Sequence, residues 1–174
     1  YLTGGPDTTW GARRVRDGHP KPFPLTYVEV GNEDWFDRSG SYDGRFAQFY
    51  DAIKKAYPKL HIIATMPVKG RKPDVIDEHY YRTAAEMARD SGHYDKYDRN
   101  GPKIFVGEWA STQGSPTPNM RAALGDAAWL TGMERNSDIV PIEAYAPLLV
   151  NVNKGAAQWG TNLIGYDNTT SFGS

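Results

Sequence analysis

The stretch Tyr27-Val28-Glu29-Val30-Gly31-Asn32-Glu33-Asp34-Trp35 decides how the rest of the chain is interpreted. Its first four residues are mainly β-branched or aromatic, which indicates a short strand. The strand ends at Gly31, and an amide, a carboxylate and an indole then follow close together. Such a strand end is typical of a site at the rim of a sheet.

A second stretch, Ile104-Phe105-Val106-Gly107-Glu108-Trp109, repeats the order of apolar strand, glycine, carboxylate and aromatic ring. In parallel strands of one sheet, both carboxylates would lie at the same rim. Glu33 and Glu108 are therefore the candidate catalytic residues. Trp35 and Trp109, next to them, are interpreted as platforms for a flat ligand face in preference to packing residues.

The chain as a whole alternates strands with helices. Apolar runs predict strands at 25–30, 61–66, 74–81, 103–109 and 139–145. Helical spacing predicts helices at about 44–57, 83–90 and 119–136. Residues 1–24 are predicted to be a long loop leading into the first strand, with a short helix beginning near Thr9, and the tail from 151 is predicted to be loop-like.

Continuous apolar strands alternating with helices predict a parallel α/β sheet that is covered on both faces. Polar residues then gather at the carboxyl ends of the strands, among them His79 and Tyr81, and in a barrel of βα units that end is the catalytic face. A doubly wound open sheet is the structural alternative, although no Gly-rich phosphate turn supports a nucleotide-binding version. We treat residues 1–174 as a single region.

The composition narrows the possible functions. Twenty basic and 21 acidic residues nearly cancel, so no nucleic-acid or membrane partner is predicted. The chain has no cysteine, and Asp77 and His79 lack a second cluster of ligands, so neither a metal site nor a cofactor is predicted. The aromatic share of 13% suits a protein that stacks rings on sugar faces.

Two carboxylates at neighbouring strand ends suit glycoside hydrolysis. One is kept protonated and donates to the leaving oxygen, while the other stays ionised and attacks the anomeric carbon or activates water. An oligosaccharide or polysaccharide is the expected partner. A sugar-binding half-domain without activity is the alternative from another class.

The motifs together resemble those of the family 51 glycoside hydrolases, the α-L-arabinofuranosidases. The resemblance covers essentially the whole chain. It rests on Tyr27 to Phe36, Asp-Glu-His-Tyr-Tyr (77–81), Val-Gly-Glu-Trp-Ala (106–110), Glu-Ala-Tyr-Ala-Pro-Leu (143–148), Trp-Gly-Ala-Arg-Arg (10–14) and Gln-Trp-Gly-Thr (158–161).

This resemblance implies that the chain supplies strands four to eight of a (β/α)8 TIM barrel. Eight strands need roughly 200 to 250 residues, so a second segment or chain is expected to complete the barrel. A C-terminal β-sandwich is also expected outside the chain. The family further implies an extracellular or periplasmic protein acting on arabinan or arabinoxylan. A β-glucanase or xylanase of the same clan is the alternative activity.

The resemblance also implies roles for individual residues. Glu33 would be the general acid/base and Glu108 the nucleophile of a retaining mechanism, with the carboxyl groups roughly 5 Å apart. Tyr81 would position the nucleophile. The other implied substrate contacts are Asn32, His79 and Gln158.

Overall fold

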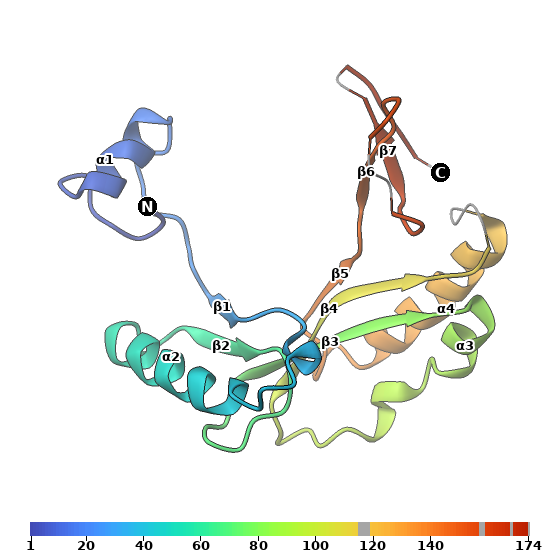
Figure 1. The fold of residues 1–174 in the computed structure, drawn as a ribbon, viewed down its shortest axis with the longest axis horizontal. Coiled ribbons are helices and arrows are strands. Elements are labelled where there is room, and N and C mark those ends of the chain that lie inside the picture. Colours follow the sequence, from blue (N-terminus) through green and yellow to red (C-terminus); the bar gives the residue numbers. More distant parts are fainter. Residues whose placement is uncertain (115–118, 157–158, 168, 174) are drawn as a thin grey trace. The chain divides into compact units, whose positions relative to one another are not determined.

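The computed structural model describes residues 1–114, 119–156, 159–167 and 169–173. The chain divides into two compact units, Tyr1–Asp74 and Val75–Ser174. The order of their helices and strands can be followed along the ribbon in Figure 1.

The first unit contains one βαβ segment, preceded by a short helix. Its elements are α1 (Thr9–Arg16), β1 (Tyr27–Val30), the 3-10 helix η1 (Asp34–Phe36), α2 (Tyr42–Ala56) and β2 (His61–Ala64). β1 pairs with β2 in parallel, with Tyr27 opposite His61 and Val30 opposite Ala64. The carboxyl ends of both strands therefore lie at the same edge of this pair.

Helix α2 covers the β1–β2 pair through the apolar positions predicted from its spacing. Phe46 is fully buried and packs with Tyr42, Leu60 and Ile62. Pro58 follows Ala56 by two residues and prevents the helix from continuing. The predicted helix at 44–57 and the predicted strands at 25–30 and 61–66 are confirmed, although β1 begins two residues later and β2 ends two residues earlier than predicted.

The segment predicted as a leading loop contains α1. Thr8 caps this helix because its side chain accepts a hydrogen bond from the Gly11 N–H. Arg14 is fully buried and its guanidinium donates to the carbonyl oxygens of Tyr1 and Gly4. These bonds fix the first residues of the chain against α1, and the ring of Tyr1 also stacks on that of Phe23.

The second unit contains two sheets. Its elements are β3 (Val75–Arg82), α3 (Ala84–Arg89), the 3-10 helix η2 (His93–Lys96), β4 (Lys103–Ser111), α4 (Met120–Arg135), β5 (Ile142–Tyr145), β6 (Leu149–Asn151), β7 (Ile164–Tyr166) and β8 (Ser171–Gly173). β4 lies between β3 and β5 and is parallel to both. β6, β7 and β8 form a separate small sheet, in which β8 is antiparallel to β7.

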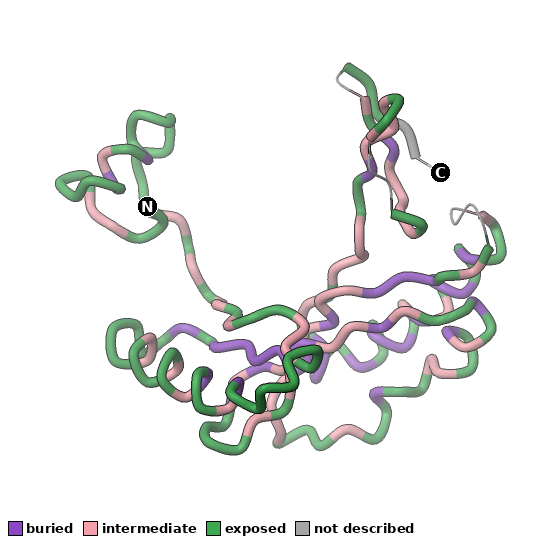
Figure 2. Tube along the Cα trace, viewed as in Figure 1, coloured by how far each residue is buried: buried purple, intermediate pink, exposed green. Residues whose placement is uncertain are grey.

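The core of the second unit lies between its parallel strands and the two longer helices. Figure 2 shows buried stretches along β3 and β4. The Tyr80 ring stacks on Trp129 of α4, with centroids 3.9 Å apart. Gly125 lets α4 approach α3 closely, since a Cβ there would lie 2.5 Å from Ala84 Cα.

The predicted strands and helices of the second unit are confirmed, although β5 begins three residues later than predicted. The tail differs from the prediction. It was expected to be loop-like, but it contains β7 and β8, which are only three residues long. Strands this short carry too little alternation to be recognised from the residue pattern.

Candidate active site

Glu108 lies on β4 directly opposite His79 of β3 in the parallel ladder. The Tyr81 hydroxyl donates a hydrogen bond of 2.8 Å to Glu108 Oε2. His79 Nδ1 lies 3.4 Å from the same oxygen. Two side chains of one strand therefore border a carboxylate of the next strand, with the Tyr81 hydroxyl donating to it and the His79 ring beside it, as expected from the common direction of alternate residues in a strand.

The Glu108 side chain is 35% exposed, whereas that of His79 is 5% exposed. The carboxylate therefore contacts side chains of β3 on one side and is still accessible to a ligand on the other. A charged group held by preorganised donors needs little rearrangement when it reacts. This arrangement suits a nucleophile better than a surface ion pair.

Behind His79 lies a buried carboxylate that the sequence analysis did not assign to the site. Asp77 Oδ2 lies 2.8 Å from His79 Nε2, and the Asp77 side chain is 1% exposed. Its other oxygen accepts a hydrogen bond from the Gly107 N–H. The position two residues before His79, on the same side of the strand, was the available signal.

Trp109 follows Glu108 and is 4% exposed. Its indole N–H donates a 2.6 Å hydrogen bond to Glu143, and its ring meets Tyr145 edge to face at 5.1 Å. Burial and these partners fix the ring against β5. Its role as a sugar platform stays a prediction, and any sugar would meet only the small exposed part of the ring.

Asp126 of α4 ties the ends of β4 and β5 together. It accepts hydrogen bonds from the Ser111 N–H and, at 3.2 Å, from the Tyr145 hydroxyl. Burial raises the pKa of the Asp126 carboxyl. Through Tyr145, this acid also supports the ring of Trp109.

In the first unit, the candidate acid Glu33 follows β1 in a sharp turn. Gly31 has a φ of +109°, and Glu33 itself has a φ of 50° and a ψ of 36°, the left-handed region. That conformation is uncommon for a residue with a Cβ and is concentrated at functional sites. The backbone is therefore strained at Glu33, the candidate general acid/base.

Asp34 holds this turn in place. Its Oδ2 accepts hydrogen bonds from the Asn32 N–H at 3.0 Å and from the Thr65 hydroxyl at 2.9 Å. A Cβ at position 31 would lie 2.0 Å from the same oxygen, so only glycine fits there. Asp34 is part of the sequence motif, but its hydrogen bonds to Asn32 and Thr65 were not predicted from the sequence.

Tyr42 supports the same turn from α2. Its hydroxyl donates to the Val30 carbonyl at 2.7 Å and accepts from the Thr65 N–H at 2.9 Å. Burial is the main reason that the pKa of Tyr42 is raised. β1, α2 and β2 therefore all contribute to presenting Asn32 and Glu33.

The remaining predicted ligand contacts are placed as follows. Asn32 is exposed on the turn, and Trp35 lies in η1 as a residue that is 39% exposed, with its ring at an angle to that of Phe36. Exposure suits a platform for a sugar ring. Gln158 lies outside the described residues.

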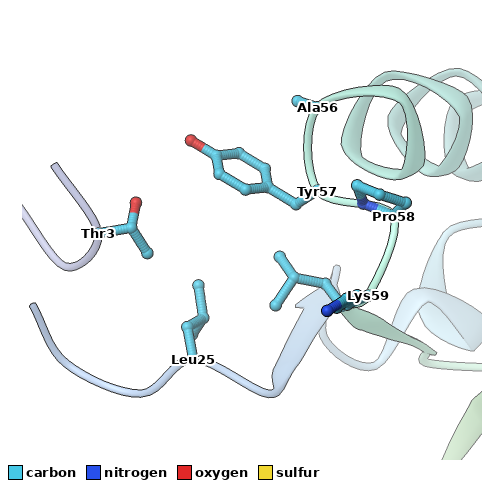
Figure 3. Close-up of a pocket in the computed structure, with 7 residues that line it drawn as sticks. Thr3, Leu25, Ala56, Tyr57, Pro58 and Lys59 are labelled. Carbon is cyan, nitrogen blue, oxygen red and sulfur yellow. The ribbon is translucent and has the colours of Figure 1, made fainter.

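The first unit also has a cavity of about 360 Å³ with a mainly apolar lining, drawn in Figure 3. Leu25 and Leu60 line it, together with the end of α2. These residues precede β1 and β2, so the cavity lies at the opposite end of this strand pair from Glu33. It is therefore separate from the candidate acid.

Comparison with known proteins gives two family matches. The Alpha-L-arabinofuranosidase 1 domain matches residues 1–99, and the Alpha-L-arabinofuranosidase C-terminal domain matches residues 107–173. Among curated relatives, Alpha-L-arabinofuranosidase 2 of Arabidopsis thaliana is 41% identical over 100% of this chain. The Extracellular exo-alpha-L-arabinofuranosidase of Streptomyces chartreusis is 39% identical over 98% of it.

The chain spans 26% of the Arabidopsis relative and 22% of the Streptomyces relative, about a quarter of their length. Both relatives are named as arabinofuranosidases, so they give no support to the alternative activity of a β-glucanase or xylanase. Across the described ranges, no helix is long and apolar enough to span a bilayer.

Among solved structures, the arabinose-bound MgGH51 α-L-arabinofuranosidase matches with a TM-score of 0.88 and 37% identity. The match covers 99% of this chain and 30% of that chain. The arabinofuranosidase of Thermotoga maritima, in complex with arabinose, matches with a TM-score of 0.70 at 20% identity, which supports the fold alone. The chain therefore has an α/β fold with parallel strands that matches part of a TIM barrel.

Proposed function

Because the chain belongs to the α-L-arabinofuranosidase family, the family 51 glycoside hydrolases, we propose that it carries the catalytic carboxylates of a retaining arabinofuranosidase. The substrates would be terminal arabinofuranosyl residues on arabinan or arabinoxylan. The observation that carries the proposal is the Glu108 carboxylate, which accepts a hydrogen bond from Tyr81, lies beside His79 and is still accessible.

Glu108 acts as the nucleophile in this proposal. Its carboxylate attacks the anomeric carbon, the bond to the leaving oxygen breaks, and a covalent arabinosyl-enzyme forms. The hydrogen bond from the Tyr81 hydroxyl favours one orientation of the carboxylate before the sugar arrives. Preorganisation of this kind lowers the rearrangement needed in the transition state.

Glu33 acts as the general acid/base. In the first step it gives its proton to the departing glycosidic oxygen, and in the second it takes a proton from the water that releases the sugar. The sharp turn after β1 supports this role because it holds Glu33 at a strand end through Gly31 and Asp34.

Six residues are proposed to contact the sugar. Asn32 and Trp35 lie on the turn of the first unit, where both are exposed. His79 and Tyr81 are proposed contacts that also border Glu108. The remaining two are Trp109 and Gln158.

We further propose that β1 to β5 are strands four to eight of the barrel. The chain spans about a quarter of its curated relatives, so residues outside it would complete the barrel and the substrate pocket. The Streptomyces relative is named extracellular, which supports an extracellular or periplasmic location.

The test uses the whole protein and aryl α-L-arabinofuranoside, β-xyloside and β-glucoside substrates. We expect preferential hydrolysis of the arabinofuranoside, with the first-formed product keeping the anomeric configuration of the substrate by time-resolved NMR. Preference for the glucoside or xyloside would overturn the substrate assignment. An inverted first product would overturn the double displacement.

A further inference from the structure

We propose that Asp77 is a positioning residue for Glu108, acting through the Gly107 backbone and the His79 ring. This inference rests on the proposed role of Glu108 as the nucleophile. Asp77 lies buried on β3, and both of its carboxylate oxygens contact groups that border Glu108.

The first route runs through an irregularity in the strand ladder. Asp77 is paired with Phe105, whereas His79 is paired with Glu108. Two steps along β3 therefore correspond to three steps along β4, which is a β-bulge just before Glu108. The extra residue on β4 leaves a backbone N–H that the regular ladder does not serve.

Asp77 supplies the acceptor at this bulge. The Gly107 N–H donates to Asp77 Oδ1 at 2.9 Å, so a side chain replaces a backbone carbonyl in the ladder. A Cβ at position 107 would lie 2.2 Å from the same oxygen. Glycine is therefore required for the carboxylate to come close, and the bond fixes the backbone immediately before Glu108.

The second route runs through His79. Asp77 Oδ2 lies 2.8 Å from His79 Nε2, and both side chains are almost completely buried. An ionised carboxylate can only accept hydrogen bonds, so Asp77 keeps a proton on Nε2. The other ring nitrogen, Nδ1, then points toward Glu108 Oε2 at 3.4 Å. One acid thus sets the orientation and tautomer of the ring beside the nucleophile.

Asp77→Asn is the most informative variant because it keeps the shape of the side chain. An amide has one oxygen and one NH2 group, so it cannot accept from both Gly107 and His79. If its oxygen keeps the Gly107 bond, its NH2 faces Nε2 and moves the ring proton to Nδ1. That proton would face Glu108 Oε2 and withdraw negative charge from the nucleophile. We expect kcat to fall on the order of 100-fold with KM little changed, as for a misplaced reacting group.

The matched control is Asp138→Asn, which changes an acid that is 60% exposed and paired with Arg99. It should leave kcat and KM unchanged. Gly107→Ala tests the other partner, since the added methyl group would push the Asp77 carboxylate away. We expect the same loss in kcat from this variant.

Neutron diffraction from the unaltered whole protein gives a readout that needs no variant. We expect a hydrogen on His79 Nε2 that points at Asp77. A ring with a bare Nε2 would overturn the proposal even if Asp77→Asn failed to fold. A normal kcat in Asp77→Asn would do so as well. Full activity in Glu108→Ala would instead overturn the proposed function itself.

Discussion

The two proposed catalytic acids are presented in different ways. Glu108 lies on β4 directly after a bulge in the β3–β4 ladder, and the Tyr81 hydroxyl of the neighbouring strand holds its carboxylate. Glu33 lies past the end of β1 in a left-handed turn, and Asp34 holds the backbone around it. The contacts described for Glu108 are made to its side chain, whereas those described for Glu33 are made to the neighbouring main chain.

This difference agrees with the two proposed roles. A nucleophile reacts at one point and gains from a fixed orientation. An acid/base must donate to one oxygen and later accept from a water, and a fixed backbone places its carboxyl group for both steps. Strain at Glu33 is of order 1–3 kcal/mol, which the Asp34 contacts offset.

Removing the nucleophile should have the largest effect. Glu108→Ala in the whole protein is expected to lower kcat about 10⁴-fold or more, because no covalent intermediate can form. Steady-state hydrolysis of an aryl arabinofuranoside measures this. The control is Glu134→Ala, which changes an exposed acid on α4 and should be silent. Comparable rates in the two variants would refute the assignment.

The next largest effect should come from the hydroxyl that holds the nucleophile. Tyr81→Phe removes the 2.8 Å hydrogen bond to Glu108 and is expected to lower kcat about 100-fold. Tyr57→Phe is the matched control, since Tyr57 is 51% exposed at the end of α2. If both variants keep full activity, side-chain fixation is not what distinguishes Glu108.

On the other side of the comparison, Asp34→Ala should loosen the backbone of the turn. The Asn32 N–H and the Thr65 hydroxyl lose their acceptor, which should lower the unfolding free energy by about 1–3 kcal/mol. Urea unfolding of the whole protein measures the change. Asp51→Ala, which breaks an exposed pair with Arg71, is the control and should barely move the midpoint.

The smallest effect tests the left-handed backbone itself. Glu33→Gly and Glu33→Ala both remove the carboxylate, but only glycine adopts a positive φ without strain. The glycine variant should therefore be more stable than the alanine variant by about 1 kcal/mol in thermal unfolding. Equal stability would mean that the Glu33 backbone is not strained.

Much of the fold was predictable because its signals are local. The apolar run from Lys103 to Trp109 indicates β4, and Phe46, Tyr50 and Ile53 at helical spacing indicate α2. α1 was predicted only as a possible start near Thr9 inside a loop. Its strongest signals, the Thr8 cap and the buried Arg14, depend on contacts rather than on periodicity.

The site was predictable where it follows a strand end, and not where it depends on three-dimensional contacts. Glu33 follows β1, and His79, Tyr81 and Glu108 lie in the carboxyl-terminal halves of β3 and β4, although their roles stay predictions. The hydrogen bonds of Asp34 and the bulge at Gly107 could not be foreseen, and the spacing of Asp77 from His79 indicated a shared side of the strand but not its bond to Gly107. A register shift leaves no mark in the residue pattern, and a single acid within a strand looks the same whether or not it has partners.

The central claim is that Glu108 forms the covalent bond to the sugar. The direct test traps the intermediate on the whole protein with an activated 2-fluoro arabinofuranoside, followed by peptide mapping by mass spectrometry. We predict one added 2-deoxy-2-fluoro-arabinosyl group, located on Glu108 in the peptide that contains Val106 to Trp109. A sugar attached to any other residue would contradict the account.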